Sequence, residues 1–220
     1  MNLNYKCLIL DHDDTVVDST KSIHYPVFRD VLKILRPEIS ITSDDFLEFC
    51  FDPGFEEYCM NFLNFSRDEL NFQYINWKQK TKEHVPDFFP GIKELLLKYK
   101  KHGGIITVVS HNDPDLIMQN YIEKTGIQPE MIFGWDDDSG KRKPSTFPVI
   151  KILEYFKLKP FEALIIDDLK PGYLMAADSG VDFAFPGWSN HPKKIEIFMK
   201  ENAKYFIKNI NDLDKILFSK

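Results

Sequence analysis

The hydrophobic residues of this chain gather in short unbroken runs, and longer amphipathic segments separate the runs. Runs without the alternation of a half-exposed strand are typical of strands that are covered on both faces of a parallel sheet. Five are found: Cys7 to Leu10, Ile105 to Val109, Met131 to Phe133, Ala163 to Ile166 and, interrupted by Asp182, Val181 to Phe185. Helical patterns lie between them, so strand and helix alternate. The pattern predicts an α/β fold with a doubly wound parallel sheet, a Rossmann-like core.

The interval between the first and second strands breaks this rhythm. From Asp18 to about Phe89 there is no comparable strand, and helix signals follow one another, among them a capping box at Ser66 to Glu69. We expect a small all-helical domain that is inserted into the α/β core after the first strand. The expected bounds are residues 18–89 for the helical domain, and residues 1–17 with 90–220 for the core.

The predicted insert is rich in aromatic residues, with ten between Phe46 and Trp77. They could form a stacking platform for a substrate, or they could form the hydrophobic core of the insert. Several recur at helical spacing, as Phe55, Tyr58 and Phe62 do, and a helix uses this spacing to bury one face. We therefore expect most of them to form the core of the insert, and they do not identify a substrate.

Composition excludes several classes of function. Hydrophobic residues make up 43% and charged residues 28% of the 220 residues, as in ordinary globular proteins. The formal net charge of −6 offers no basic surface for nucleic acid or anionic lipid, and no apolar stretch approaches the roughly 18 residues of a membrane span. Three cysteines without metal-ligand spacing favour a reducing, cytoplasmic setting. We expect a monomer or weak dimer that binds neither nucleic acid nor membrane.

Polar residues that can carry chemistry follow the first predicted strand. Asp11, Asp13, Asp14 and Thr15 place three carboxylates and a hydroxyl directly after Leu10. A single acid here would be explained as a cap of the next segment, but three within four residues exceed that need. In open α/β sheets, ligands bind outside the carboxyl ends of the strands. The sequence therefore predicts a binding site at this end of the sheet.

The second predicted strand also ends in polar residues. Ser110 offers a hydroxyl, and the backbone N–H groups that follow it, at His111 and Asn112, could meet an anion. Taken alone, this signal is weak, and Ser110 or Asp113 acting as a plain helix cap explains the segment better.

The fourth predicted strand is followed by Asp167 and Asp168, and an adjacent pair of carboxylates suits a hard divalent cation. Lys143, in the loop beyond the third strand, supplies a positive charge. Lys141 and Arg142 stand beside it, so chemistry alone does not single out Lys143. Three strands thus present ligand groups at their carboxyl ends.

The charge of these groups decides what the site must contain. Carboxylates about 5 Å apart repel one another by roughly 3 kcal/mol per pair at an effective dielectric constant near 20. A phosphate dianion could not enter such a site unaided. Mg²⁺ held by oxygens, with Lys143 as a further positive charge, would neutralise the acids and stabilise a transferring phosphoryl group. We therefore expect Mg²⁺ as the cofactor and a small phosphorylated molecule as the substrate.

In this arrangement the chain resembles the haloacid dehalogenase superfamily. Asp11-His12-Asp13-Asp14-Thr15 is similar to the first motif of the family, Asp-x-Asp-x-Thr; Ser110 is similar to the second, Lys143-Pro144 to the third and Asp167-Asp168 to the acidic fourth. The motifs occur in order, and the resemblance covers essentially the whole core. The insert looks like the helical cap of the phosphoglycolate phosphatase and β-phosphoglucomutase branch.

The resemblance implies hydrolysis of a phosphomonoester through an aspartyl-phosphate. Asp11 would be the nucleophile and a Mg²⁺ ligand. Asp13 would protonate the leaving oxygen and later activate water, and its backbone carbonyl would bind the metal. The phosphate would be bound by Ser110, His111, Asn112 and Lys143, and the metal by Asp11, Asp13, Asp167 and Asp168, with either of the last two as the direct ligand.

Two positions depart from the pattern of the family. Asp14 stands where glycine is usual, which adds a charge beside the phosphate and restricts the backbone of the loop. Leu169 stands where a small hydroxyl residue is common. We expect these changes to affect the rate or the metal affinity but not the class of enzyme.

Other functions stay open. A sugar phosphomutase would use a histidine of the cap, and His24 resembles it, but His24 lies one residue late, which turns a helix face by about 100°. We therefore expect His24 to be a linker or surface residue. A non-enzymatic phosphoacceptor module also combines acids, Mg²⁺, a hydroxyl and a lysine, but it lacks a long helical insert after its first strand. Dehalogenases and phosphonatases have no acid at the position of Asp13.

Overall fold

A sheet of six parallel strands forms the centre of the molecule in the computed structural model, which describes residues 2–136, 138–189 and 191–219. The strand order is β4-β3-β2-β5-β6-β7, and all neighbouring strands in it pair in parallel. The strands are β2 (Cys7–Leu10), β3 (Ile105–Val109), β4 (Met131–Phe133), β5 (Ala163–Ile166), β6 (Asp182–Pro186) and β7 (Tyr205–Ile207). The predicted fold class is confirmed, and only β6 is displaced, by one residue, from the predicted strand.

The strand order reverses beside β2. From β2 the chain runs outward to β3 and β4, and it then returns to place β5 on the other side of β2. Leu10 pairs with both Val108 and Ile166, so the three strands end at the same level. A reversal of this kind opens a crevice at the carboxyl ends of the central strands, where ligands of such sheets bind.

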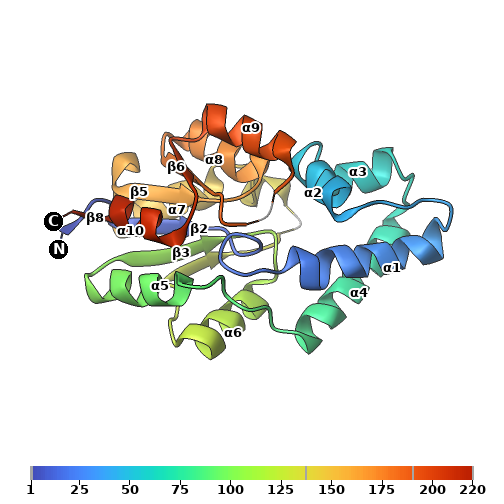
Figure 1. Ribbon diagram of the computed structural model, residues 1–220, viewed down its shortest axis with the longest axis horizontal. Coiled ribbons are helices and arrows are strands. Elements are labelled where there is room, and N and C mark those ends of the chain that lie inside the picture. Colours follow the sequence, from blue (N-terminus) through green and yellow to red (C-terminus); the bar gives the residue numbers. More distant parts are fainter. Residues whose placement is uncertain (1, 137, 190, 220) are drawn as a thin grey trace.

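Helices cover both faces of the sheet (Figure 1). One face packs against α5 (Ile92–Lys101), α6 (Pro114–Thr125) and α10 (Ile210–Leu217), and the other against α7 (Phe147–Phe156), α8 (Lys170–Ser179) and α9 (Lys193–Asn202). Every residue of β2 and β5 is buried as a result. Short 3₁₀ segments at Ser139–Lys141 and Pro160–Glu162 join the elements. A two-stranded sheet of β1 (Asn2–Leu3) and β8 (Phe218–Ser219) closes one end.

The interval after β2 contains helices and no strand in residues 18–87. It consists of a π-helical turn (Thr20–His24), α1 (Tyr25–Leu35), α2 (Ser43–Phe51), α3 (Phe55–Asn61) and α4 (Arg67–Glu83). These helices gather at the end of the molecule away from the paired chain ends (Figure 1). The predicted capping box is present, since Ser66 accepts from the Glu69 N–H and Glu69 accepts from the Ser66 N–H.

The helical segment has its own hydrophobic cluster, in which Phe28, Phe46 and Phe49 are buried and Phe55 and Tyr58 are partly buried. This packing is the one that the helical spacing of the aromatic residues predicts. With Phe65 the cluster contains five of the ten aromatic residues, which is half of them and not most; Phe51, Phe62, Phe72, Tyr74 and Trp77 lie outside it. Phe62 is 63% exposed, and Phe51 packs against Phe198 of α9, where it joins the helices to the core.

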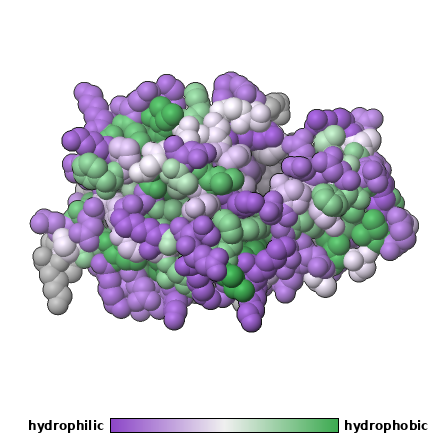
Figure 2. Space-filling model, turned by 90° about the horizontal axis from the view of Figure 1, so that it is seen from above, coloured by the Kyte–Doolittle hydropathy of each residue, from purple (hydrophilic) through white to green (hydrophobic). Residues whose placement is uncertain are grey.

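The surface is mostly hydrophilic, with apolar residues in small scattered groups on both ends of the molecule (Figure 2). In the described parts of the chain, no helix combines the length and the apolar character that a bilayer crossing requires.

Candidate active site

Three carboxylates meet where β2 and β5 end. Asp11 follows β2, and its backbone N–H donates to the carbonyl of Ile166, the last residue of β5, at 2.9 Å. This pairing brings Asp11 beside Asp167 and Asp168, because parallel strands in register end together. Carboxylate oxygens of the three residues lie within 4.8 Å of one another, and all three side chains are buried. We call them the acidic cluster.

Lys143 reaches into the acidic cluster from the loop after β4. Its Nζ lies 2.7 Å from Oδ1 of Asp11 and 2.6 Å from Oδ2 of Asp167, and the residue is only 6% exposed. Burial acts to lower the pKa of Lys143, but the charges of Asp11 and Asp167 outweigh it, so this pKa lies above its usual value. Of the three adjacent basic residues, Lys141, Arg142 and Lys143, it is Lys143 that contacts the acidic cluster. Arg142 instead lies over the ring of Trp135.

One lysine does not neutralise three buried acids. Burial raises the pKa of Asp167 to about 7. Burial also raises the pKa of Asp168 well above its usual value, and the neighbouring carboxylates of Asp11 and Asp167 raise it further. Such shifts mean that the ionised forms lack compensating charge. The cluster is therefore suited to a further cation.

The hydrogen bonds of the two adjacent acids differ. Both oxygens of Asp167 are engaged, since Oδ1 accepts from the backbone N–H of Leu169 at 2.9 Å and Oδ2 from Lys143. Oδ2 of Asp168 faces the ring of His191, whereas its Oδ1 is buried and has no partner among the described residues. A buried oxygen without a partner calls for an explanation. An all-oxygen set of this kind fits a hard cation such as Mg²⁺.

Gly172, in the first turn of α8, allows this packing. A Cβ atom at this position would lie 2.1 Å from Cγ of Asp167. Any side chain would therefore push the helix away from the acidic cluster.

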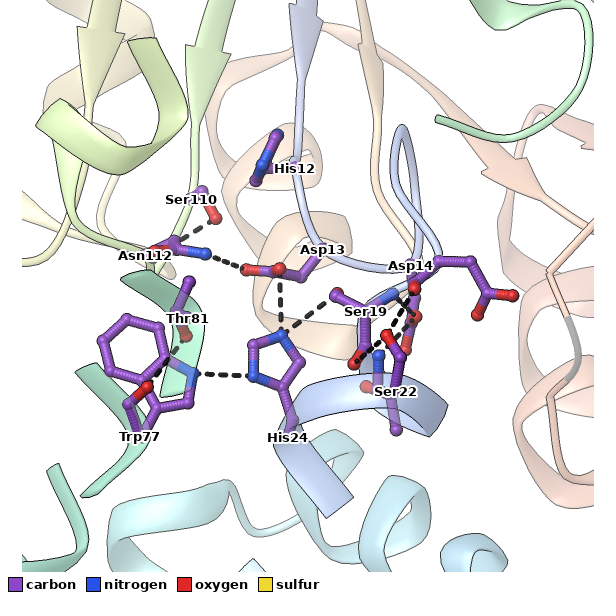
Figure 3. A network of polar contacts seen from close by, with 12 residues as sticks. His12, Asp13, Asp14, Ser19, Ser22, His24, Trp77, Thr81, Ser110 and Asn112 are labelled. Atoms are coloured by element: carbon purple, nitrogen blue, oxygen red, sulfur yellow. Dashed lines mark hydrogen bonds and ion pairs between the residues drawn. The ribbon is translucent and has the colours of Figure 1, made fainter. Parts of the chain in front are cut away.

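A second group of polar side chains lies beside the acidic cluster and includes residues of the helical segment (Figure 3). Asp13 receives a hydrogen bond from Nδ2 of Asn112 on its Oδ2 at 2.8 Å, and its Oδ1 lies 2.9 Å from Nε2 of His24. Trp77 of α4 donates its indole N–H to Nδ1 of His24 at 2.7 Å. We call Asp13, His24, Trp77 and Asn112 the linker cluster.

The expectation for His24 is met in one part, since it lies in the linker before α1, and wrong in the other, since it is not a surface residue. Its ring is largely buried, stacks on Trp77 and contacts Asp13. Because the indole N–H of Trp77 can only donate, Nδ1 of His24 accepts and the ring proton lies on Nε2. That nitrogen faces Asp13 and, at 3.0 Å, Oγ of Ser19.

A π-helical turn explains why the one-residue shift does not turn His24 away. The N–H of His24 bonds to the carbonyl of Ser19 at 3.2 Å, five residues back, and the N–H of Tyr25 bonds to the carbonyl of Thr20. A π turn holds one residue more than an α turn. The π turn therefore accommodates the one extra residue before His24, and the His24 side chain lies on the same side of the helix as Ser19. The calculation of 100° per residue applies only to a regular α-helix.

Asp14 contacts the linker and not the acidic cluster. Its backbone is left-handed, with φ of 54°, a conformation that aspartate tolerates better than most residues. Its Oδ1 accepts the N–H groups of Ser19 and Thr20 at 3.2 and 3.0 Å. Asp14 therefore ties the first motif to the start of the π turn, which the residue pattern alone did not indicate.

The residues after β3 lie next to both clusters. Ser110 is buried and its Oγ accepts the N–H of Asn112 at 3.3 Å. His111 places Nε2 3.0 Å from the carbonyl of Lys143. Asp113 caps α6, as one of the two expectations for this segment had it. Phosphate binding by Ser110, His111, Asn112 and Lys143 stays a prediction.

Two residues at the site carried no sequence signal. His191 contacts Asp168, and Trp188 donates its indole N–H to the carbonyl of Thr15 at 3.1 Å. Both follow β6, the strand with the weakest pattern. Ligands bind beyond the carboxyl ends of parallel strands, and this rule applied to the fifth predicted strand, Val181 to Phe185, would have indicated the residues after β6. It would not have indicated these two contacts.

Comparison with known proteins places the chain in a family. The model of the family described as "Haloacid dehalogenase-like hydrolase" matches residues 8–185. A curated relative described as "Putative pyrophosphatase PpaX", from Caldanaerobacter subterraneus subsp. tengcongensis, is 25% identical over 96% of this chain and 93% of its own length. A hydrolase family argues against the phosphoacceptor module.

Solved structures share the fold. A predicted phosphoglycolate phosphatase from Haemophilus somnus has a TM-score of 0.76 at 16% identity and covers 97% of this chain and 98% of its own. A "putative beta-phosphoglucomutase" from Bacteroides vulgatus has a TM-score of 0.75 at 16% identity and covers 97% of this chain and 88% of its own. The chain belongs to the haloacid dehalogenase-like hydrolases, the family whose model matches residues 8–185.

Proposed function

We propose that the chain is a Mg²⁺-dependent phosphatase that hydrolyses a small phosphomonoester through an aspartyl-phosphate on Asp11. The observation that carries this proposal is the buried acidic cluster, in which Asp11 lies 2.7 Å from Lys143. A carboxylate beside a fixed cation, at the end of a central strand, can meet a phosphoryl group that the cation binds. The unpartnered Oδ1 of Asp168 supports a metal in the same cluster.

We also propose the division into two domains, a core of residues 1–17 and 90–220 and a cap of residues 18–89. The separate hydrophobic cluster of the four helices supports it. Val17 and Phe88 pair in an isolated antiparallel bridge, so the two connections lie side by side at the proposed boundary. We further propose that the enzyme is cytoplasmic, in line with its three free cysteines. We also propose that it is a monomer or weak dimer.

In the first step, a carboxylate oxygen of Asp11 attacks phosphorus, and the bond from phosphorus to the leaving oxygen breaks. Asp13 gives its proton to that oxygen. Lys143 and Ser110 hold the phosphoryl oxygens while charge develops on them. Mg²⁺, when bound, neutralises the acids and polarises the phosphoryl group. The direct metal ligands would be Asp11, Asp168 and the backbone carbonyl of Asp13.

In the second step, a water molecule attacks the aspartyl-phosphate, Asp13 takes a proton from it, and the bond from phosphorus to Asp11 breaks. Because Asp13 has given up its proton in the first step, it is ionised and can act as the base of this step. Asp167 would hold Lys143 in place, because it gives one oxygen to that side chain.

A screen of phosphorylated metabolites, with release of inorganic phosphate as the readout, tests the proposal. Turnover should require Mg²⁺ and should stop in excess chelator. The Asp11→Asn variant, run in parallel, excludes a contaminating phosphatase. No turnover of any phosphomonoester, or full activity in chelator, would contradict the proposal.

A second candidate is a sugar phosphomutase, and the contact between His24 and Asp13 favours it. A histidine from the cap that touches the acid–base residue can couple proton transfer to the position of the cap. A sugar 1-phosphate, supplied with the corresponding sugar bisphosphate, separates the two candidates. A mutase converts it into the isomeric phosphate, whereas a phosphatase releases inorganic phosphate from it.

A further inference from the structure

The loop after β6 lies beside the acidic cluster and contacts it. We define the β6 loop as residues 187–189 and 191–192, and neither the sequence motifs nor the proposed mechanism assigns it a role. It contacts two parts of the site, the carboxylate of Asp168 through His191 and the carbonyl of Thr15 through Trp188. Of the two contacts, the one to Asp168 bears directly on a proposed metal ligand.

The ring of His191 is fixed on three sides. Its side chain is 1% exposed, and its centroid lies 4.8 Å from that of Phe185. Nδ1 lies 3.1 Å from the carbonyl of Ser189. Because a carbonyl can only accept, Nδ1 carries a proton, and the orientation of the ring is determined. Nε2 then faces Oδ2 of Asp168 at 3.2 Å, and this contact is a hydrogen bond when one proton lies between the two atoms, either on Nε2 of the doubly protonated ring or on Oδ2.

This contact decides which oxygen of Asp168 is free. The ring occupies Oδ2, and Oδ1 is left buried without a partner among the described residues. Without the ring, the carboxylate would be free to turn about its own bond, and neither oxygen would be held in a fixed direction. Asp167 needs no such support, because the N–H of Leu169 and Lys143 already hold both of its oxygens.

The β6 loop itself is anchored to the fold. A Cβ atom on Gly187 would lie 2.9 Å from the ring of Phe206 and 3.0 Å from the carbonyl of Ile207, so the loop runs close against β7. The N–H of Ser189 bonds back to the carbonyl of Pro186. A short loop that is fixed in this way can hold His191 in a defined position.

We propose that His191 is a positioning residue, which holds Oδ2 of Asp168 so that Oδ1 is directed at a divalent cation in the acidic cluster. The inference rests on the proposed function only in taking Mg²⁺ as that cation. Residues that orient metal ligands typically contribute 10- to 100-fold to metal affinity. His191 touches neither substrate nor metal in this account.

Two variants of similar length and volume test the proposal. His191→Gln keeps an N–H group that can donate to Asp168, whereas His191→Met does not. Isothermal titration of Mg²⁺ into the metal-free chain gives the affinity without substrate. We expect His191→Met to bind Mg²⁺ about 10- to 100-fold more weakly than the wild type and His191→Gln to recover most of the loss. His84→Met, at an exposed histidine of the cap, is the matched control and should bind as the wild type does.

Circular dichroism of each variant in chelator checks that it is folded. If folded His191→Met binds Mg²⁺ as tightly as the wild type, or if the Gln and Met variants are equally weakened, the positioning role is wrong while the proposed function stands. If the wild type shows no Mg²⁺ binding, both this inference and the metal of the proposed function are wrong. If His191→Met does not fold, the comparison of His191→Gln with the wild type decides, and a loss above tenfold overturns the proposal.

Discussion

The acidic cluster and the linker cluster lie side by side, but they are built in different ways. The acidic cluster is formed by strand ends and loops of the α/β core alone, and its geometry follows from the pairing of β2 with β5. The linker cluster joins Asp13 and Asn112 of the core to His24 and Trp77 of the helical segment. Under the proposed mechanism, the comparison teaches that metal binding needs no residue of the helical segment, whereas proton transfer through Asp13 depends on where that segment lies.

Other contacts confirm that the cap is held against the core at several points. Lys78 of α4 bonds to Asp113 at the start of α6 at 2.6 Å. On the other side, Glu56 of α3 lies 3.3 Å from Arg142. A movement of the cap would break these pairs together with the contact between His24 and Asp13, and it would leave the acidic cluster intact.

The largest effect is expected for Asp11→Asn, at the centre of the acidic cluster. An amide cannot serve as the attacking carboxylate, so turnover should fall below detection. No phosphoenzyme should form with any substrate. Mass spectrometry after a rapid acid quench should show the added phosphate on the peptide that contains Asp11 in the wild type only. Near-normal turnover of this variant, or a phosphate mapped to Asp13, would show that the roles are assigned wrongly.

The next effect concerns Asp13, which links the two clusters. Asp13→Asn should leave the nucleophile in place but remove the proton donor and base, at a cost of roughly 10²- to 10⁴-fold in kcat. The loss should be smaller for phosphorylation by an aryl or acyl phosphate, whose leaving group needs little protonation. With such a substrate the phosphoenzyme should accumulate, and its slow decay can be followed by the same quench. An equal loss of phosphorylation rate for all leaving groups would contradict an acid role.

The two adjacent acids that follow β5, Asp167 and Asp168, should differ in how much they contribute to Mg²⁺ affinity. Asp168→Ala removes the proposed direct ligand and should weaken Mg²⁺ binding by more than 100-fold, whereas Asp167→Ala should cost about 10- to 100-fold, since it acts through Lys143. Calorimetric titration of the metal-free variants gives both affinities. The reverse order would make Asp167 the direct ligand.

The smallest effect is expected for Trp77→Phe in the cap. The variant keeps an aromatic ring but loses the hydrogen bond to His24, which is worth about 0.5–1.5 kcal/mol. A loss of up to about tenfold in kcat/KM should follow, because that energy corresponds to roughly a factor of ten. The affinity for Mg²⁺ should not change, since the acidic cluster contains no cap residue. A change in Mg²⁺ affinity would show that the two clusters are not independent.

The acidic cluster could be predicted from the sequence because few physical facts determine it. Unbroken apolar runs gave the parallel strands, and parallel strands bring the residues that follow them, Asp11 and Asp167, to one edge. The resemblance to the family indicated Lys143, whereas chemistry alone did not distinguish it from Lys141 or Arg142; its buried contact with Asp11 does. The role of Gly172, which allows the close approach of α8 to Asp167, is visible only in three dimensions.

The linker cluster could not be predicted, because its position depends on the local winding of the backbone. The sequence does not show that Thr20–His24 winds as a π turn, and the expectation of a surface position for His24 failed there. His191 could not be predicted from the sequence either, for a related reason. It lies five residues beyond β6, so no rule about strand ends reaches it, and its partner Asp168 is 23 residues away in the chain.

The π turn between Ser19 and Tyr25 bears on how relatives of this chain should be aligned. An alignment that counts residues from Asp13 and allows no gap would set Ile23 opposite the histidine of a relative with a regular α turn, although Ile23 is a fully buried apolar residue. A gap of one residue within Thr20–His24 restores the spatial match. Searches that look for this histidine at a fixed distance from the first motif will miss members of the family in which insertion of a single residue has been absorbed without moving the ring.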